Sequence, residues 1–564
     1  MKACVFLLIC TAVLLPLSVR AMEVTLCTDD TQKPSGGNGI NLQTALQAGG
    51  VITFNCGGPA TIHLKNTYTI QRDTTIIGGG TITLDGGHNW FGMFLGSGNA
   101  ISLTVHGVHI VNAGRFAKPG DIGRVHGGFI GGKFGVVQLF SVTVESSVWP
   151  VWLETGGLLI HASQFSNNDG SVVIGSDIQL SHSVFSNNRR GTIRSVGGNV
   201  TIADSQFLSN RGPAIVSGGT LNVSHTNFTA NVSGENGGAL RIGSNATIEE
   251  SDFYNNDAAN GGAIFIDGNT ATVSLRALKF HNNVATQTGG AVGFEKSQLP
   301  LMLTVLHTTF QENLANMGGA IALERDFRNN LFMNGSAVAF ILNQAKDRGG
   351  AIYAPNAGIA LSRGVFIGNR AGTAGGAIYA LEQNNSKVAF ANSLLVRNAA
   401  PIGSAFLGNR ASFINCTLTD NGENSVRPQA IPLGPSLATT PFFIQFVNSI
   451  VAGSLSTPCG TAPASVPYTG SNNLQFPGTG CGAGFAVAYP WLGPYYVPFF
   501  WSPAIGAGND GVCQANPINN KDVYNVRRPL GRGSCTIGAA EGSIQHLIER
   551  WRSRESGLSF TNER

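Results

Sequence analysis

A four-residue phrase, Phe-x-x-Asn, recurs nine times between residues 165 and 369 and constrains the fold more than any other feature of the sequence. Successive copies begin 20 to 30 residues apart, and degenerate copies extend the series to residue 421. From residue 237 they alternate with six copies of Gly-Gly-Ala followed by Leu, Ile or Val. A fixed period in this range is typical of a solenoid, in which each repeat buries its apolar face only against its neighbours. Residues 165–421 are therefore predicted to form a regular stack of coils.

The residue types between these phrases predict the kind of solenoid. Residues 261–267 and 270–275 are short, alternating stretches rich in β-branched and aromatic side chains. Such stretches, bounded by glycine or asparagine, are typical of strands of about three to six residues separated by tight turns. No helical period of useful length runs through the block. We therefore predict an all-β, single-stranded parallel β-helix, in which strands of adjacent coils pair about 4.8 Å apart.

Stacking of identical coils gives each phrase a structural role. The phenylalanines are predicted to form an internal aromatic column, and the paired glycines to supply positive φ where the chain turns into the next strand. The asparagines should form a ladder at one turn, because asparagine tolerates the left-handed conformation and its amide can bond the asparagine of the next coil. The predicted ladder consists of Asn168, Asn188, Asn210, Asn231, Asn256, Asn283, Asn313, Asn343 and Asn369.

The two phrases in alternation resemble the repeat of the chlamydial polymorphic outer-membrane proteins. This repeat also occurs in many secreted bacterial and some eukaryotic β-helix proteins. The resemblance covers nearly half of the chain. It implies a right-handed parallel β-helix, a hand that the crossover rule for parallel strands also favours. It further implies a secreted protein or one at the cell surface.

The first residues fit a secretory signal peptide over residues 1–21. Lys2 supplies the positive start, Val5–Leu17 the apolar run, and Ala21 ends a small-residue cleavage site. The apolar run is too short for a transmembrane helix, so we expect no transmembrane span in the mature chain.

Residues 22–60 are predicted to cap the open end of the solenoid, where unpaired strand edges and apolar core would otherwise meet water. Asn41 is expected to N-cap a short helix that Gly49 and Gly50 end. Its apolar face would consist of Leu42, Ala45 and Leu46. The β-helix proper is then expected over residues 61–421, and it becomes regular at 165.

Seven cysteines remain after the predicted cleavage, and export makes disulfides plausible. Cys416 lies in a strand-like stretch and is predicted to be left over as a buried thiol. The spacing contains no CxxC pair, so zinc is not expected. The other six are clustered so as to suggest three pairs, although spacing alone leaves other connectivities open. These pairs are Cys27–Cys56, Cys459–Cys481 and Cys513–Cys535.

Two less regular stretches have two interpretations each. Arg115–Phe134 is predicted to be a loop that either contributes to a binding face or is a disordered excursion. Tyr489–Trp501 is strongly aromatic within a chain that is only 8% aromatic. It could stack on carbohydrate, but we expect it to be the hydrophobic plug of the C-terminal end.

Residues 422–542 are predicted to hold the last coils and a disulfide-containing C-terminal module. Its phrases Trp501–Gly508, Arg527–Pro529 and Cys535–Glu541, together with Asp522, resemble the module called choice-of-anchor Q, which closes many secreted bacterial β-helices. The chain departs from that pattern at two usual aspartates. Residues 543–564 are predicted to be a short amphipathic tail. Its apolar residues are Ile544, Leu547, Ile548 and Trp551.

The sequence contains no evident catalytic machinery. The NTD, DD, GHG and RIK set of polygalacturonase-like β-helices is missing, as is a GxSxG elbow. One alternative depends on stacking, because the seventh residue of three successive Gly-Gly-Ala phrases is Asp267, Glu295 and Glu324. In register these carboxylates would lie about 5 Å and about 10 Å apart, spacings that bracket glycosidase geometry. They could also hold Ca²⁺. Lys296 and Arg325 follow directly, so we favour surface ion pairs.

We therefore expect an adhesin-like or structural protein, secreted or at the cell surface, that binds an extracellular glycan or another surface component. We expect a monomer without a cofactor. The 35 basic and 31 acidic residues are scattered, which makes nucleic acid an unlikely partner. The alternative is a polysaccharide lyase or glycoside hydrolase that uses the stacked carboxylates, with Ca²⁺ if any metal.

Overall fold

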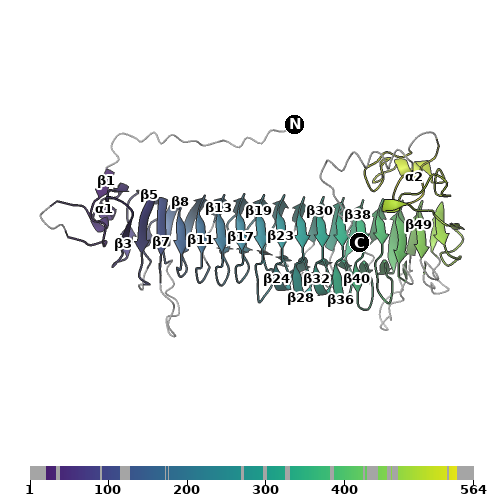
Figure 1. Cartoon of the computed structure of the whole chain (residues 1–564), viewed down its shortest axis with the longest axis horizontal. Helices are drawn as coiled ribbons and strands as arrows, with labels where there is room; N and C mark the ends of the chain where they lie inside the picture. The colour runs from purple at the N-terminus through teal and green to yellow at the C-terminus, as the bar shows by residue number, and fades with distance from the viewer. Residues whose placement is uncertain are drawn as a thin grey trace. The chain divides into compact units, whose positions relative to one another are not determined.

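The computed structural model divides the chain into two units, residues 1–184 and 185–564. The boundary falls inside β14 (Val184–Ser186). Within the described part of each unit, nearly every element is a short strand, and the paired strands are parallel (Figure 1). The predicted signal peptide, apart from Ala21, and the predicted tail lie outside the described residues. The structure describes residues 21–33, 38–88, 92–114, 128–171, 173–175, 177–267, 272–295, 301–323, 331–381, 387–422, 426–427, 443–453, 459, 468–529 and 533–542.

The N-terminal unit begins with the predicted helical cap. The helix α1 (Leu42–Ala48) follows Asn41, whose side-chain oxygen accepts a hydrogen bond from the Thr44 amide. Leu42, Ala45 and Leu46 are buried, and Gly49 closes the helix with a φ of 68°. The sequence prediction is confirmed here because the capping residue, the apolar spacing and the terminal glycine are all local signals.

A disulfide and a buried carboxylate connect the cap to the coils beneath it. Cys27 and Cys56 are joined by one of the three predicted disulfides, and β1 (Ala21–Val24) pairs with β2 (Gly50–Phe54). Asp30 is fully buried, and one of its carboxylate oxygens accepts hydrogen bonds from the Lys65 and Asn66 amides and the Tyr68 hydroxyl. Because an unpaired buried charge is costly, these donors hold the cap in one position.

The coils of the N-terminal unit are built from longer strands than the repeats. Part of the predicted loop over residues 115–134 is wrong: Phe129, Ile130 and Phe134 are buried, and β8 begins at Ile130. Two glycines of the predicted loop lie against neighbouring backbone, since a Cβ on Gly128 would sit 2.3 Å from the carbonyl oxygen of Val148 and one on Gly132 2.7 Å from that of Gly96. Residues 115–127 of the predicted loop lie outside the described residues. The remaining strands are β3 (Ala60–His63), β4 (Tyr68–Ile70), β5 (Thr74–Asp85), β6 (Phe94–Ser97), β7 (Ser102–Val111), β8 (Ile130–Phe140), β9 (Thr143–Glu145), β10 (Val151–His161), β11 (Gln164–Ser166), β12 (Val173–Gly175) and β13 (Asp177–Ser181).

The C-terminal unit stacks most of its strands in three columns, and a regular coil contributes one strand to each column. The first column, which includes the Gly-Gly-Ala coils, comprises β15 (Ile193–Ser195), β18 (Ile215–Ser217), β21 (Leu240–Ile242), β25 (Ile264–Ile266), β29 (Val292–Phe294), β33 (Ile321–Ala322), β37 (Ile352–Tyr353), β41 (Ile378–Ala380), β44 (Phe406–Gly408) and β47 (Val426–Arg427). The second comprises β16 (Val200–Ala203), β19 (Leu221–Ser224), β22 (Ala246–Glu249), β26 (Thr272–Arg276), β30 (Leu301–Leu306), β34 (Leu331–Ser336), β38 (Gly358–Ser362), β42 (Val388–Ala391), β45 (Arg410–Ile414), β48 (Phe443–Val447) and β50 (Thr469–Ser471).

The third column carries the Phe-x-x-Asn phrases. It comprises β14, β17 (Gln206–Leu208), β20 (Asn227–Thr229), β23 (Asp252–Tyr254), β27 (Lys279–His281), β31 (Thr309–Gln311), β35 (Ala339–Ile341), β39 (Val365–Ile367), β43 (Leu394–Val396), β46 (Thr417–Asn421), β49 (Ile450–Gly453), β51 (Asn473–Phe476) and β52 (Phe485–Val487). A separate five-stranded sheet lies beside the middle coils (Figure 1). Its strands are β24 (Asp257–Asn260), β28 (Val284–Thr288), β32 (Leu314–Met317), β36 (Gln344–Arg348) and β40 (Arg370–Ala371).

The phenylalanines of the phrase form the predicted internal column in the C-terminal unit. Consecutive rings from Phe185 to Phe366 are stacked, with centroids 4.7 to 5.1 Å apart. This distance follows from the strand spacing, since each ring sits on the equivalent ring of the next coil. In the N-terminal unit, Phe165 is buried within β11.

The asparagines of the phrase form a buried hydrogen-bonded ladder. Asn256 shows the pattern: its Nδ2 donates to Oδ1 of Asn283, 2.9 Å away, and to the carbonyl of Phe228 in the preceding coil. Its backbone amide also donates to Oδ1 of Asn283. The contact between amides of successive coils repeats from Asn188 to Asn421. In the N-terminal unit, Asn168 accepts from the Ser147 amide and donates to the Val144 carbonyl.

The turn at the ladder differs from the prediction in one respect. Positive φ falls on the residue before each ladder asparagine, for example 54° at Asn282 and 54° at Glu312, and not on the ladder asparagine itself. The preceding residue makes the turn, and the asparagine that follows it can then direct its amide into the interior. The position of the turn therefore depends on the inward-facing amide rather than on asparagine's tolerance of the left-handed region.

The two glycines of each Gly-Gly-Ala phrase have different roles. The first has the predicted positive φ, for example 65° at Gly289. The second is required by close approach instead, since a Cβ on Gly290 would lie 2.1 Å from the carbonyl oxygen of Gly319 in the next coil. Any side chain at this position would collide with backbone.

Cys416 is a free, fully buried thiol, as predicted. Burial raises its pKa from 9.0 to about 12. Because the thiolate is the nucleophile, we expect the native protein to resist iodoacetamide at about pH 8, while the unfolded chain reacts. Since the folded pKa is raised, the group's contribution to stability is complete below 9.0 and is lost as the pH rises toward about 12.

Peptide mass spectrometry after alkylation, with and without denaturant, measures both states of Cys416. Labelling of the native protein as fast as the unfolded chain would contradict the buried position of this thiol.

After β52 the chain runs back beside the last coils, through η1 (Pro494–Tyr496) and α2 (Asp510–Gln514) (Figure 1). The Ala539 amide donates to Oγ1 of Thr417 at 2.8 Å, and Nδ2 of Asn392 donates to the Lys521 carbonyl. Val497 and Val523 pack against the outer faces of β39 and β43. The other two predicted disulfides, Cys459–Cys481 and Cys513–Cys535, lie in this C-terminal region.

Candidate ligand-binding surface

The aromatic stretch near the end of the chain folds as a compact hairpin loop. The Phe499 amide donates to the Trp491 carbonyl at 2.9 Å, and the Gly493 amide donates to the Val497 carbonyl at 2.8 Å. Pro490 is buried, and its carbonyl accepts a hydrogen bond from the Ser502 hydroxyl, which closes the base of the loop. These bonds fix the backbone on both sides of the turn. The loop is therefore ordered by backbone hydrogen bonds, and its exposed rings do not need to be buried to hold it in place.

Four rings of this loop are about half exposed. The exposed fraction is 50% for Tyr489, 49% for Trp491, 65% for Phe500 and 53% for Trp501. Tyr489 is in edge contact with Trp491 and with Phe476, at centroid distances of 5.0 and 5.1 Å. We call these four exposed rings, with Phe476 and Phe499, the aromatic surface.

The rings are ordered by contact with one another as well as by the backbone. Trp501 stacks on Phe499 at 4.9 Å and meets Phe500 edge-on at 4.5 Å. Gly493 makes room for the Phe499 ring, since a Cβ there would lie 2.9 Å from it. Rigid aromatic side chains contribute large contact areas while losing little conformational entropy on binding.

The hydrophobic-plug interpretation is therefore wrong for the four exposed rings, whereas Tyr495, Tyr496 and Val497 pack against the coils. Val497 and Pro498 are buried, but the rings listed above face outward. An apolar run by itself does not tell which way each side chain points. Neighbouring residues of this hairpin loop point in different directions, and the carbohydrate-stacking interpretation fits the exposed rings better.

The first residue of the predicted carboxylate row, Asp267, forms an ion pair with Arg241. Asp267 and Glu295 end equivalent strands, β25 and β29, which pair in register. Nε of Arg241 lies 3.2 Å from both carboxylate oxygens of Asp267. Burial raises the pKa of Asp267, Arg241 lowers it, and Glu295 raises it, with a net increase. The third member, Glu324, lies outside the described residues, as do Lys296 and Arg325.

Arg241 was missed from the sequence, because it is the fifth residue of its Gly-Gly-Ala phrase and not the seventh. Stacking that phrase on the next one would have placed it beside the strand that leads to Asp267. The described residues contain no group of three or more His, Cys, Asp or Glu side chains that could hold a metal ion.

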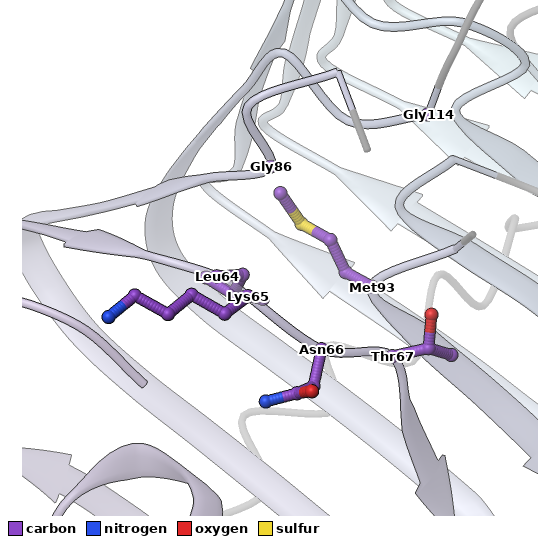
Figure 2. Close-up of a pocket in the computed structure, with 7 residues that line it drawn as sticks. All are labelled: Leu64, Lys65, Asn66, Thr67, Gly86, Met93 and Gly114. Atoms are coloured by element: carbon purple, nitrogen blue, oxygen red, sulfur yellow. The ribbon is translucent and has the colours of Figure 1, made fainter. Parts of the chain in front are cut away.

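A small pocket in the N-terminal unit offers little for ligand chemistry. It is lined by Leu64–Thr67, Gly86, Met93 and Gly114. Figure 2 shows Met93 extending toward Gly86, while Lys65 and Asn66 extend away from it. Its lining provides no convergent polar side chains of the kind that fix a ligand's orientation.

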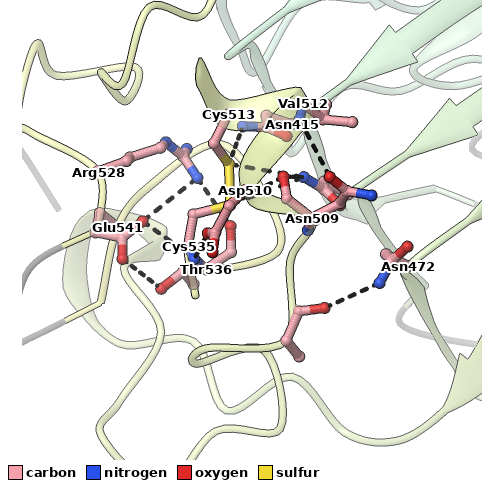
Figure 3. Close-up of a disulfide and its surroundings, with 12 residues drawn as sticks. Asn415, Asn472, Asn509, Asp510, Val512, Cys513, Arg528, Cys535, Thr536 and Glu541 are labelled. Atoms are coloured by element: carbon pink, nitrogen blue, oxygen red, sulfur yellow. Dashed lines mark hydrogen bonds and ion pairs between the residues drawn. A yellow bond between two sulfur atoms is a disulfide. The ribbon is translucent and has the colours of Figure 1, made fainter. Parts of the chain in front are cut away.

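A buried polar network holds the segment that follows the aromatic loop. The Arg528 guanidinium is fully buried and donates to the carbonyls of Thr536, Gly538 and Ala539. It lies 3.6 Å from the Glu541 carboxylate, which also accepts from the Thr536 hydroxyl (Figure 3). Tyr524 of the same segment donates its hydroxyl to the Tyr495 carbonyl at 2.6 Å. The network therefore holds in place the segment whose Tyr524 bonds the loop.

The disulfide Cys513–Cys535 lies between this network and a column of turn asparagines. Nδ2 of Asn415 is 3.2 Å from Sγ of Cys513. The Asn509 amide donates to Oδ1 of Asn448, and Nδ2 of Asn472 donates to the Ala507 carbonyl (Figure 3). The C-terminal segment is thus attached to three successive coils.

Comparisons with known proteins agree with this fold. Residues 151–299 match the family described as the right handed beta helix region, and residues 364–381 match the Chlamydia polymorphic membrane protein repeat. Metabotropic glutamate receptor-like protein R from Dictyostelium discoideum is 30% identical over 165 residues, which is 27% of this chain and 9% of that protein. The chain thus matches less than a tenth of the length of that curated relative.

Among the described residues, no helix has both the length and the apolar character needed to cross a membrane. The strand register and the two family matches together establish the architecture. The chain is a right-handed parallel β-helix with repeats similar to those of the chlamydial polymorphic membrane proteins.

Proposed function

We propose that this protein is secreted or held at the cell surface, where its aromatic surface binds glycans. Residues 1–21 would direct export, and the three disulfides suit an oxidising compartment. The β-helix would be the rigid support, and the hairpin loop at residues 489–502 the contact region. A monomer is sufficient for this role, and it requires no cofactor.

One observation carries the proposal: four aromatic rings of one short loop are about half exposed, although burial of such rings is strongly favourable. Contiguous exposed apolar surface on a soluble protein usually marks an interaction site. Sugar rings present flat C–H faces that pack on aromatic rings, and their hydroxyls remain free to bond water or polar side chains. Tyr489 meets both Trp491 and Phe476 edge to face, and this ordered pair of exposed rings suits such a ligand.

We further propose that residues 501–541 are a module similar to choice-of-anchor Q, within a C-terminal domain over residues 422–542. The buried Asp522, Arg528 and Glu541 support this assignment. They occupy an Asp, the last Arg and the final Glu of the phrases that this segment resembles. In this protein the module's part is to fasten the end of the chain to the coils.

The expected result of Trp491→Ala is a loss of glycan binding by the full mature chain. Truncating a central aromatic contact residue costs about 2 kcal/mol, or roughly thirtyfold in Kd. The double variant Tyr489→Ala/Trp491→Ala should abolish measurable binding. A glycan array identifies the ligands, and titration calorimetry with one of them measures Kd.

The matched control for this experiment is Met302→Ala. Met302 is 48% exposed, close to Trp491 at 49%, but lies on β30 in the middle of the coils. It should leave Kd unchanged. Equal binding by the wild type and the double variant would contradict the proposal. It would also be contradicted if the wild type released reducing ends from the glycans and Asp267→Ala/Glu295→Ala abolished that release.

A further inference from the structure

The aromatic surface lies within a long stretch that carries no charge. From Pro428 to Asn509, 82 residues contain no Asp, Glu, Lys, Arg or His. Charged residues make up 12% of the chain, so about 10 would be expected over this length. The rings of the aromatic surface, with the exposed Val487 beside them, all belong to this stretch.

Two charged side chains of opposite sign interact with Tyr496 of the loop. The Arg397 guanidinium is 6.0 Å from the Tyr496 ring centroid, and Asp420 also interacts with Tyr496. Tyr496 itself packs against the coils with Val497. Arg397 and Asp420 are both exposed to solvent, and the ring that they approach is that of Tyr496, which is not part of the aromatic surface.

We infer that the ligand is an uncharged polysaccharide of hexose or N-acetylhexosamine units, and not a polyuronate or a sulfated glycan. This inference rests on the proposed glycan-binding function. A carboxylate or sulfate brought against these rings would lose water without gaining a cationic partner among the residues of the aromatic surface, which is strongly unfavourable. A neutral sugar loses little, because its C–H face is apolar and its hydroxyls stay at the edge of the contact.

Polar groups of the right kind lie on the same final coils. Thr469 and Ser471 are exposed at the ends of β50. Hydroxyls can donate to and accept from sugar hydroxyls. An anionic membrane is a poorer fit, because binding to it depends on Lys and Arg next to the apolar residues.

The test compares neutral and charged polymers at low and high salt, using the full mature chain. The probes are a soluble β-glucan, a mannan and chitin oligosaccharides, against polygalacturonate and heparin. We expect at least one neutral probe to bind, with a Kd that changes less than about twofold between the two salt conditions. Neither charged probe should bind within the same concentration range.

A charge-gain variant sharpens the test. Phe500→Lys places a cation on the aromatic surface. It should weaken binding of the neutral probe and introduce salt-dependent binding of polygalacturonate. Met302→Lys is the control: Met302 is 48% exposed, against 65% for Phe500, and lies on β30 outside the aromatic surface. This variant should leave binding of the neutral probe unchanged and should not bind polygalacturonate.

The outcomes separate the two proposals. Binding of polygalacturonate or heparin at Trp491, weakened by salt, would overturn the neutral-ligand inference and leave glycan binding in place. Failure of every polymer would overturn the proposed function itself. Light scattering could instead show self-association, or the protein could bind anionic vesicles. If Trp491→Ala removed either property, both proposals would be overturned, because the aromatic surface would then bind a second copy or a membrane.

Discussion

Asn283→Ala is expected to destabilise the C-terminal unit by about 4 kcal/mol or more, because four buried hydrogen bonds end on this one side chain. Its Nδ2 donates to the Phe253 carbonyl and to Oδ1 of Asn313, each at 3.0 Å. Its Oδ1 accepts from the backbone amide and Nδ2 of Asn256. Each partner left unpaired in the interior costs about 1–3 kcal/mol, and no water can replace the amide without a cavity of suitable shape.

The isosteric variant Asn283→Asp distinguishes hydrogen bonding from packing. A carboxylate keeps the two acceptor contacts but faces the Phe253 carbonyl and Asn313 Oδ1 with no proton to donate. We expect it to be at least as destabilising as alanine at neutral pH. Burial without a cation would raise the new carboxyl's pKa above its unfolded value of about 3.9. Part of the lost stability should therefore return as the pH falls, once protonation restores one donor.

Urea unfolding gives the midpoint and slope for each variant, and hydrogen exchange of the Asn256 amide reports the local effect. The control is Asn222→Ala, an exposed asparagine on β19, which should change stability by less than about 0.5 kcal/mol. A cost below about 1 kcal/mol for Asn283→Ala would mean that the ladder is a consequence of the fold and not a cause of its stability.

The features that could be predicted are those in which sequence period and structural register coincide. A residue that returns once per coil must stack on its equivalent, so the Phe185–Phe366 column and the asparagine ladder follow directly from the phrase. The cap helix carries its signals within nine residues, from Asn41 to Gly49. The disulfides could be predicted because the six cysteines are clustered near the two ends of the sequence, and each pairs with the neighbour 22 or 29 residues away.

The features that could not be predicted depend on direction, which spacing does not encode. Asn282 and Asn283 are adjacent and chemically identical, yet one makes the turn and the other faces the interior. The same limit applies to Tyr489–Trp501, where an apolar run is compatible with burial or exposure. The ion pair between Arg241 and Asp267 joins different positions of two successive phrases, so counting one position along the repeat misses it.

Arg528→Met is expected to detach the C-terminal segment while leaving the coils folded. The guanidinium donates to three carbonyls, and Glu541 lies beside it in the same buried site. Removing one member of a buried charge pair typically costs about 3–5 kcal/mol, because the remaining carboxylate loses its cation inside the protein. Arg528→Lys should restore little, since one ammonium group cannot reach all three carbonyls.

This variant also tests how the aromatic surface is supported. The segment around Arg528 holds Tyr524, whose hydroxyl bonds the Tyr495 carbonyl inside the aromatic loop. Loss of this hydrogen bond in Arg528→Met should raise the Kd for the glycan by about tenfold or more, because ordering the rings would then cost free energy at the moment of binding. Hydrogen exchange should remain slow at the ladder amides, while limited proteolysis should cut within residues 503–542 of the variant only.

Arg527→Met is the control, because the neighbouring Arg527 is exposed and the substitution removes the same charge. It should match the wild type in proteolysis and in Kd. If Arg528→Met instead unfolds the coils together with the segment, the C-terminal segment is part of one cooperative unit with the β-helix. If it changes neither protection nor binding, the buried network does not position the loop, and the rings of Tyr489 and Trp491 are held by the hairpin alone.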